Sequence, residues 1–139
     1  MRNRHHLLLS IIGCLAITIA SCGKKDERFD IRGQVTYQNE PIGEGKILFM
    51  PVDESRPQAI AKIVDGEYKT ASPGGVFPGE YRVQVFGYRG TGKIQDLGEL
   101  YGKQEQQVQY VPAKFNHETE LNLQISADKI EYDFDLKEP

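Results

Sequence analysis

Beyond residue 28 the hydrophobic pattern of the chain has a period of two residues, and this feature most limits what the chain can form. Successive side chains of a strand point to opposite faces, so alternation gives one buried and one solvated face. Residues 80–86 (EYRVQVF) and 121–125 (LNLQI) alternate in this way. No segment of this region shows a convincing helical period. The pattern therefore predicts an all-β domain.

Turn-forming residues divide this region into short strands. The predicted strands cover residues 31–37, 46–50, 58–64, 67–71, 80–86, 121–125 and 132–136. Asp65-Gly66 is the clearest turn signal, because this dipeptide readily adopts the positive φ angles of a two-residue hairpin. Phe49, Tyr81 and Phe134 stand at strand positions and are expected in the core. Seven short strands in a segment of this length are typical of a β-sandwich.

The N-terminus has the layout of a lipoprotein signal peptide. Arg2 and Arg4 precede an apolar run over residues 7–20, which is shorter than the roughly 20 residues that cross a bilayer. Residues 19–22 (IASC) resemble the bacterial lipobox, in which small residues precede an acylated cysteine. We expect cleavage before Cys22 and lipid on its sulfur. The alternative is an ordinary signal peptide with an incidental cysteine.

This interpretation divides the chain into a signal peptide (1–21), a lipidated tether (22–28) and one β-domain (29–139). Lipid on Cys22 makes a membrane the first predicted partner, since two or more acyl chains give stable attachment. Gly23 stands where an aspartate would indicate retention at the inner membrane. The predicted location is the cell envelope, at the outer membrane or periplasmic face and not in the cytoplasm.

Charge and cysteine content narrow the function classes. Removal of residues 1–21 takes away two of the 17 basic residues and none of the 20 acidic ones, which changes the formal net charge from −3 to −5. Nucleic acid is disfavoured as a partner, because phosphate neutralisation needs clustered positive charge. Cys14 leaves with the signal peptide and Cys22 is expected to be acylated. The folded domain is therefore expected to contain no disulfide.

Residues 87–111 interrupt the strand pattern with a segment rich in glycine and glutamine. A loop of this length is either a mobile crossover or a binding loop. Tyr88, Arg89 and Tyr101 are the candidate ligand-contact residues in it, because exposed tyrosines stack on sugars or contact a partner protein. Residues 87–93 (GYRGTGK) also match the G-x-x-x-x-G-K spacing of a phosphate-binding loop. Ile94 occupies the position of the required Ser or Thr, so a flexible glycine loop is preferred.

The remaining polar residues do not assemble a catalytic set. His117 is the only histidine left after processing and lies in a polar turn, so an exposed structural role is expected. Glu131, Asp133 and Asp135 alternate along the last predicted strand. A solvated stripe beside lysines of a neighbouring strand is preferred to a calcium site. No catalytic residue, metal site or cofactor is predicted.

Several motifs in order resemble one type of bacterial lipoprotein. The segments DIRGQVTYQNEPIGEGKILFMP, VFPGEYRVQV and VPAKF, followed by a terminal DFDL, are similar to lipoproteins with a carboxypeptidase regulatory-like, transthyretin-like domain. Such proteins are numerous in planctomycetes. The resemblance runs from Ile31 to Leu136 and implies a Greek-key β-sandwich of about seven strands that acts as an accessory or surface module. It implies no ligand.

Two functions follow as expectations. The first is a non-catalytic structural or protein-interaction module of the cell envelope, anchored to a membrane through Cys22. The second is a carbohydrate-binding module that uses Tyr88 and Tyr101. An enzyme is disfavoured: residues 88–91 (YRGT) are similar to the ending of transthyretin-related hydroxyisourate hydrolases, but here they are internal and the histidines that accompany that ending are missing.

Overall fold

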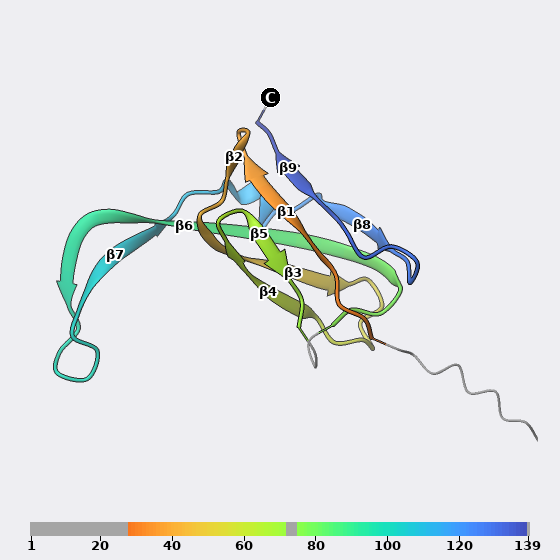
Figure 1. Cartoon of the computed structure of the whole chain (residues 1–139), viewed down its shortest axis with the longest axis horizontal. Coiled ribbons are helices and arrows are strands. Elements are labelled where there is room, and N and C mark those ends of the chain that lie inside the picture. The colour runs from red at the N-terminus through yellow and green to blue at the C-terminus, as the bar shows by residue number, and fades with distance from the viewer. Residues whose placement is uncertain (1–27, 72–74, 139) are drawn as a thin grey trace, which may run out of the picture.

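The structure, a computed structural model, describes residues 28–71 and 75–138 and confirms the all-β class (Figure 1). Its strands are β1 (Arg32–Tyr37), β2 (Glu40–Pro41), β3 (Glu44–Pro51), β4 (Ala59–Val64), β5 (Glu67–Lys69), β6 (Gly79–Asp96), β7 (Lys103–Gln109), β8 (Asn122–Ile125) and β9 (Phe134–Leu136). A 3-10 turn, η1 (Ala113–Phe115), precedes β8. Each of the seven predicted strands is present, and β2 and β7 are additional. Within the described part of the chain, no helix is long and apolar enough to cross a membrane.

All nine strands join in one open sheet. The order β2-β1-β5-β4-β3-β6-β7 forms its main path, with β8 paired to β6 and β9 paired to β1. Every pairing between these strands is antiparallel except that of β1 with β9, which is parallel. Isolated bridges extend the sheet at Phe29–Val76 and Arg32–Glu131. The outermost strand of the main path is β7.

Two tight turns fix the register of neighbouring strands. Asp65 and Gly66 adopt φ angles of 50° and 82°, as the Asp-Gly signal predicts for the β4–β5 hairpin. Gln38 and Asn39 also have positive φ angles, 53° and 63°, and join β1 to β2 in the same manner. Because a hairpin turn sets which residues face each other, these turns place the alternating side chains of β1, β4 and β5 on one common face.

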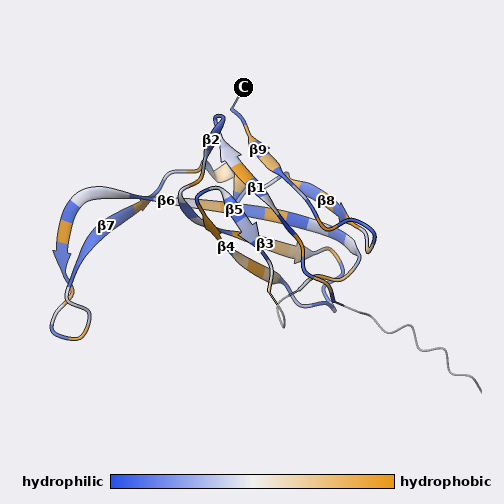
Figure 2. Ribbon diagram, in the orientation of Figure 1, coloured by the Kyte–Doolittle hydropathy of each residue, from blue (hydrophilic) through white to orange (hydrophobic). Residues whose placement is uncertain are grey.

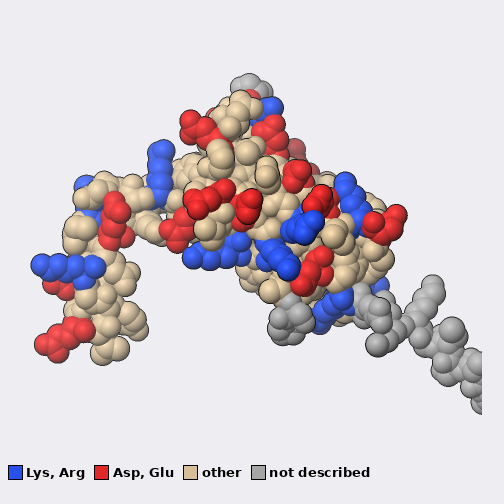
Figure 3. Space-filling model, viewed as in Figure 1, with Lys and Arg blue, Asp and Glu red and all other residues tan. Residues whose placement is uncertain are grey.

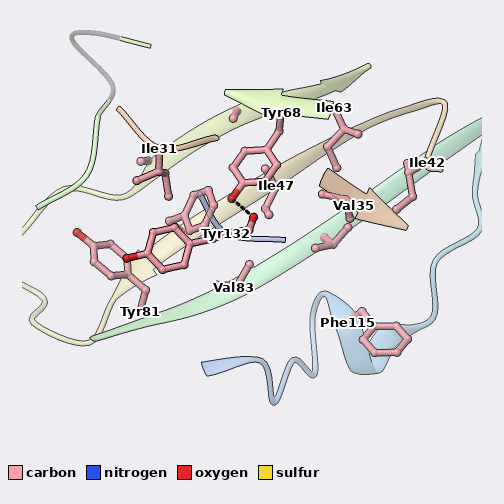
Figure 4. Close-up of a cluster of buried hydrophobic side chains, with 14 of the residues drawn as sticks. Ile31, Val35, Ile42, Ile47, Ile63, Tyr68, Tyr81, Val83, Phe115 and Tyr132 are labelled. Carbon is pink, nitrogen blue, oxygen red and sulfur yellow. Dashed lines mark hydrogen bonds between the residues drawn. The ribbon is translucent and has the colours of Figure 1, made fainter. Parts of the chain in front are cut away.

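The inward-facing side chains form one core (Figure 4). Ile31, Val35, Ile47, Ile63, Phe49, Tyr81, Val83, Val85, Ile125 and Leu136 are buried in it, and Phe134 packs against it. The Tyr68 hydroxyl donates a hydrogen bond of 2.7 Å to the carbonyl oxygen of Tyr132 inside this core. The prediction that Phe49, Tyr81 and Phe134 are core residues is confirmed.

Gly33 allows the C-terminal segment to lie close against β1. A Cβ atom at Gly33 would overlap the carbonyl oxygen of Tyr132 and lie 2.6 Å from its carbonyl carbon. The Tyr132 amide also donates to the carbonyl oxygen of Arg32 at 2.9 Å. A side chain at position 33 would therefore push the final segment off β1.

Candidate interaction site

The most exposed part of the described fold is a hairpin arm, which we define as residues 88–109. The second half of β6 and all of β7 form it, and it projects from one end of the body (Figure 1). Arg28 lies near the other end of β6, where its guanidinium is 5.0 Å from the ring of Phe77. The sequence predicted a loop over residues 87–111, and this assignment of secondary structure is wrong. This segment is mostly a two-stranded ribbon, closed by a tip at residues 97–102.

A bulge in β6 shapes the arm. Gly90 faces Gln107 across the hairpin, but the next paired position is Ile94 with Glu105, so the three residues 91–93 of β6 stand opposite the single residue Gln106 and β6 has two extra residues. Gly92 has a φ of 75° in this bulge, and its amide donates to the Glu105 carboxylate at 2.7 Å. A Cβ at Gly90 would lie 2.5 Å from the same carboxylate group. The phosphate-loop-like segment 87–93 is thus a strand with a bulge.

The arm exposes apolar side chains that no other described residue covers. Those with large exposed fractions are Ile94, Leu97, Leu100, Tyr101 and Val108, with Leu100 at 87% and Tyr101 at 67%. They stand out against the otherwise hydrophilic ribbon (Figure 2). Ile94, Leu97, Leu100 and Tyr101 lie toward the tip, whereas Val108 pairs with Arg89 near the base. Exposed apolar side chains on a projecting element are typical of a contact surface.

The three predicted contact residues do not form one site. Tyr88 lies at the base of the arm, where it pairs with Gln109, and Arg89 follows it. Tyr101 lies at the tip. Tyr88 pairs with Gln109 and Asp96 pairs with Lys103, and these partners are six residues apart along β7, a distance of roughly 20 Å. The arrangement offers two separate contact regions and no shared aromatic platform.

The base of the arm has its own aromatic cluster. The Arg89 guanidinium lies 5.2 Å from the centre of the Tyr110 ring, a cation–π contact. The Tyr110 ring lies 6.0 Å from that of Tyr37. Burial raises the pKa of the Tyr110 hydroxyl, and Arg89 opposes that shift. Arg89 is thus engaged in a contact within its own chain.

A polar groove lies on the outer side of β1, β4 and β5. It has a volume of about 820 Å³, and its lining includes Arg32, Lys62, Lys69, Glu67 and Asp133. Acidic and basic side chains are interspersed over the face of the molecule that Figure 3 shows, including the arm. A groove with both signs of charge suits a neutral polar ligand better than a strongly charged one.

The C-terminal carboxylates Glu131, Asp133 and Asp135 are exposed, as the predicted solvated stripe requires, and each contacts a residue of β1. The Arg32 guanidinium meets Glu131 at 2.7 Å, the Gln34 amide donates to Asp133 at 2.8 Å, and the Thr36 hydroxyl donates to Asp135 at 2.9 Å. The only lysine in this series is Lys137 of the same segment, which contacts Asp135 at 2.6 Å. Since each carboxylate has its own partner, the three act as a ladder that fastens the C-terminal segment to β1.

His117 is exposed, as predicted, and its ring packs edge-on against Phe86 at 5.2 Å. Its neighbour Asn116 is different. Asn116 belongs to the same polar turn, but it is buried and its side-chain amide donates at 2.9 Å to the carbonyl oxygens of both Val111 and Pro112. The one sequence signal for this role is its position directly after the buried Phe115. Asn116 closes the connection from the arm to β8.

Metal ligands are not grouped in the described ranges, where no three His, Cys, Asp or Glu side chains could hold one ion together. Cys22, the predicted lipidation site, and the whole signal peptide lie outside the described residues.

Comparison with known proteins gives no relative. No family model, curated protein or solved structure matches the chain.

Proposed function

We propose that the chain is a lipoprotein anchored through Cys22 to a membrane of the cell envelope, and that its β-domain is a non-catalytic protein-interaction module. The observation that carries this proposal is the hairpin arm with its exposed apolar tip. The arm continues the far end of β6, whereas Arg28, the first described residue, lies beside Phe77 just before β6 begins (Figure 1). In a module with this layout, the hairpin arm and the N-terminal end of the described domain lie at different ends of the molecule, so the arm stays accessible to a partner.

The energetics of the arm favour a partner. Two strands alone are marginally stable in water, and three strands or a packed face are needed for independent stability. Between Arg89 and Gln109 no third strand of the described chain pairs with the arm. Its apolar side chains gain nothing from exposure to water, whereas burial of a Leu or Ile side chain contributes about 1.5–3 kcal/mol. A bound protein supplies the missing contacts.

The resemblance to carboxypeptidase regulatory-like lipoproteins supports the same proposal from the sequence. It implies that the seven core strands form a Greek-key β-sandwich that serves as a surface module. In that view β7 and the second half of β6 are an elaboration of the sandwich, and the contact function belongs to the elaboration. The lipobox at residues 19–22 supplies the anchor.

A second candidate function, glycan binding, is favoured by the polar groove over β1, β4 and β5. Its mixed charges and open shape suit a neutral sugar. The aromatic residue that lines it, Tyr68, is only 3% exposed, so the ring gives little stacking surface. The arm and the groove are separate places, and a variant of one leaves the other intact.

Photo-crosslinking tests the interaction role. A photoreactive amino acid at Leu100, in the full chain expressed in a lipoprotein-processing bacterium, is expected to capture a protein. The same group at Ile60 is the matched control, because Ile60 is an exposed apolar residue of the body. Equal capture at both positions, or none at Leu100, would contradict the proposal. Retention on a glycan array that is lost in Lys62→Ala but kept in Leu100→Ser would favour the groove instead.

The anchor is tested separately with Cys22→Ala. Loss of the acylated sulfur is expected to move the protein from the membrane fraction to the soluble fraction, because each acyl chain contributes about 0.8 kcal/mol per buried CH₂. The lipid on wild-type Cys22 is read by mass spectrometry of the N-terminal peptide. Unchanged fractionation of Cys22→Ala would refute the anchor.

A further inference from the structure

The outer edge of β7 carries backbone groups without a strand beside them. The Tyr110 amide donates to the carbonyl oxygen of Gly87 at 3.0 Å, and the Leu97 amide donates to that of Gly102 at 2.9 Å. Backbone groups of a strand alternate in direction, so even-numbered residues from Gly102 to Tyr110 direct their N–H and C=O groups toward β6. Lys103, Glu105, Gln107 and Gln109 direct theirs outward.

This edge lacks the usual protections against pairing. Native edge strands are shortened, bulged or interrupted by proline. β7 has seven residues, no proline and one lysine, and the bulge of the arm lies on β6. The free edge of β6 over residues 89–96 is broken by that bulge and by the positive φ of Gly92. Of the two free edges of the arm, β7 is therefore the regular one.

We propose that β7 pairs in an antiparallel manner with β7 of a second copy of this chain, centred on Gln106. This inference rests on the proposed function and names the partner of the arm. With Gln106 opposite Gln106, all seven residues of β7 pair: Lys103 with Gln109, Gln104 with Val108, and Glu105 with Gln107. The neighbouring centres at positions 105 and 107 pair only five residues each. Centring on Glu105 also sets two like charges opposite each other.

Net charge favours contact through the arm over contact through the body. The arm carries three basic residues (Arg89, Lys93, Lys103) and three acidic ones (Asp96, Glu99, Glu105), so its formal charge is zero. The whole net charge of −5 expected for the processed chain belongs to the rest of it. Two bodies repel each other, whereas two arms do not. Attachment of both copies to one membrane raises their effective concentration.

The same register also gives the apolar tip of each arm a neighbour, the base of the partner arm. Continued beyond the strand ends, it places Tyr101 of one copy opposite Val111 of the other. The tip of each arm then lies beside the base of the partner arm, where Tyr110 and Arg89 form their cation–π contact. Four strands in one ribbon replace two isolated pairs, which meets the requirement for more than two strands.

Disulfide trapping in intact cells tests the register. The backbone groups of Gln106 point toward β6, so the Gln106–Gln106 pair across the interface makes no backbone hydrogen bonds. The Cα atoms of such a pair are about 4.5 Å apart, within the roughly 4.4–6.8 Å range of disulfides. The full chain with Gln106→Cys is expected to form a disulfide-linked dimer after mild oxidation. Gln95→Cys is the matched control, because position 95 is equally exposed on the same arm but lies on β6. The unsubstituted chain reports any dimer formed through an unacylated Cys22.

Charge at position 107 provides a second test. It is made in the Gln106→Cys, Glu44→Gln background, because the Gln107 side-chain amide donates to the Glu44 carboxylate at 2.9 Å within its own chain. Gln107→Lys places two lysines opposite Glu105 residues across the interface and is expected to raise the dimer yield. Gln107→Glu places acids there and is expected to lower it. Each change alters two symmetric pairs, and the expected change in the dimerisation constant is roughly two- to thirtyfold. Equal yields in both variants would overturn the pairing.

The outcomes separate this inference from the proposed function. A trapped dimer at position 106 and none at position 95 supports self-pairing. A monomer at position 106, together with a photo-crosslink from Leu100 to a different protein, overturns self-pairing and leaves the interaction role in place. Absence of both products overturns both.

Discussion

Substitution of Gly33 by alanine tests how the C-terminal segment is held. The added Cβ would overlap the Tyr132 carbonyl group, whose oxygen accepts the Tyr68 hydroxyl hydrogen bond. Overpacking costs about 1–3 kcal/mol. Displacement of Tyr132 also breaks its bonds to Tyr68 and to Arg32, each worth about 1 kcal/mol. We expect a loss of about 3–5 kcal/mol, a large part of the about 5–15 kcal/mol typical of a domain.

Urea unfolding of residues 23–139, followed by tyrosine fluorescence, measures this loss. Gly43→Ala is the matched control, since a Cβ at Gly43 meets no atom within 4 Å. The control is expected to change the free energy of unfolding by no more than about 0.5–1 kcal/mol, in the stabilising direction. If Gly33→Ala were as stable as Gly43→Ala, the close approach of the last segment to β1 would be refuted.

Three further predictions follow from the buried polar groups and the arm. Asn116→Ala is expected to destabilise the domain by about 2–3 kcal/mol in urea unfolding, because two carbonyl oxygens lose their amide donor, whereas the exposed neighbour His117→Ala is expected to have little effect. Burial raises the pKa of Tyr68 above its ordinary value of about 10, so the unfolded chain ionises first and stability falls as the pH rises above about 10. Tyr68→Phe is expected to reduce that slope by up to about 1.4 kcal/mol per pH unit; an unchanged alkaline unfolding curve would contradict the assignment. Glu105→Ala removes the acceptor of the Gly92 amide and is expected to speed hydrogen exchange in the arm but not in β3, which mass spectrometry of peptides resolves.

The strands of the body are predictable from the sequence because each has one buried face. The alternation of residues 80–86 and 121–125 marks the same side chains that the structure buries, and Asp65-Gly66 marks the turn that it contains. The charged stripe of the last segment is also visible in the sequence. Its partners on β1 are not, because Arg32 and Glu131 are 99 residues apart and no local pattern connects them.

The arm escapes prediction for the opposite reason. Both faces of residues 88–109 are largely in solvent, so no hydrophobic alternation develops along them. Gly98 and Gly102, with φ angles of 84° and 65°, were the available signs of a hairpin tip. Tyr88 and Tyr101 look close when the segment is taken for a loop. An extended ribbon separates them, so the two predicted contact residues lie in separate regions of the arm.

The parallel pairing of β1 with β9 sets a condition on when the protein can mature. The first strand of the described chain has the last one as a neighbour, so its final partner is synthesised after the other described strands. Contacts of such long separation form slowly. The pairing of β1 is therefore incomplete until residues 134–136 are available, which delays folding of the sheet around β1. A chain cut short before Glu131 would leave one side of β1 bare and open to the strands of other molecules.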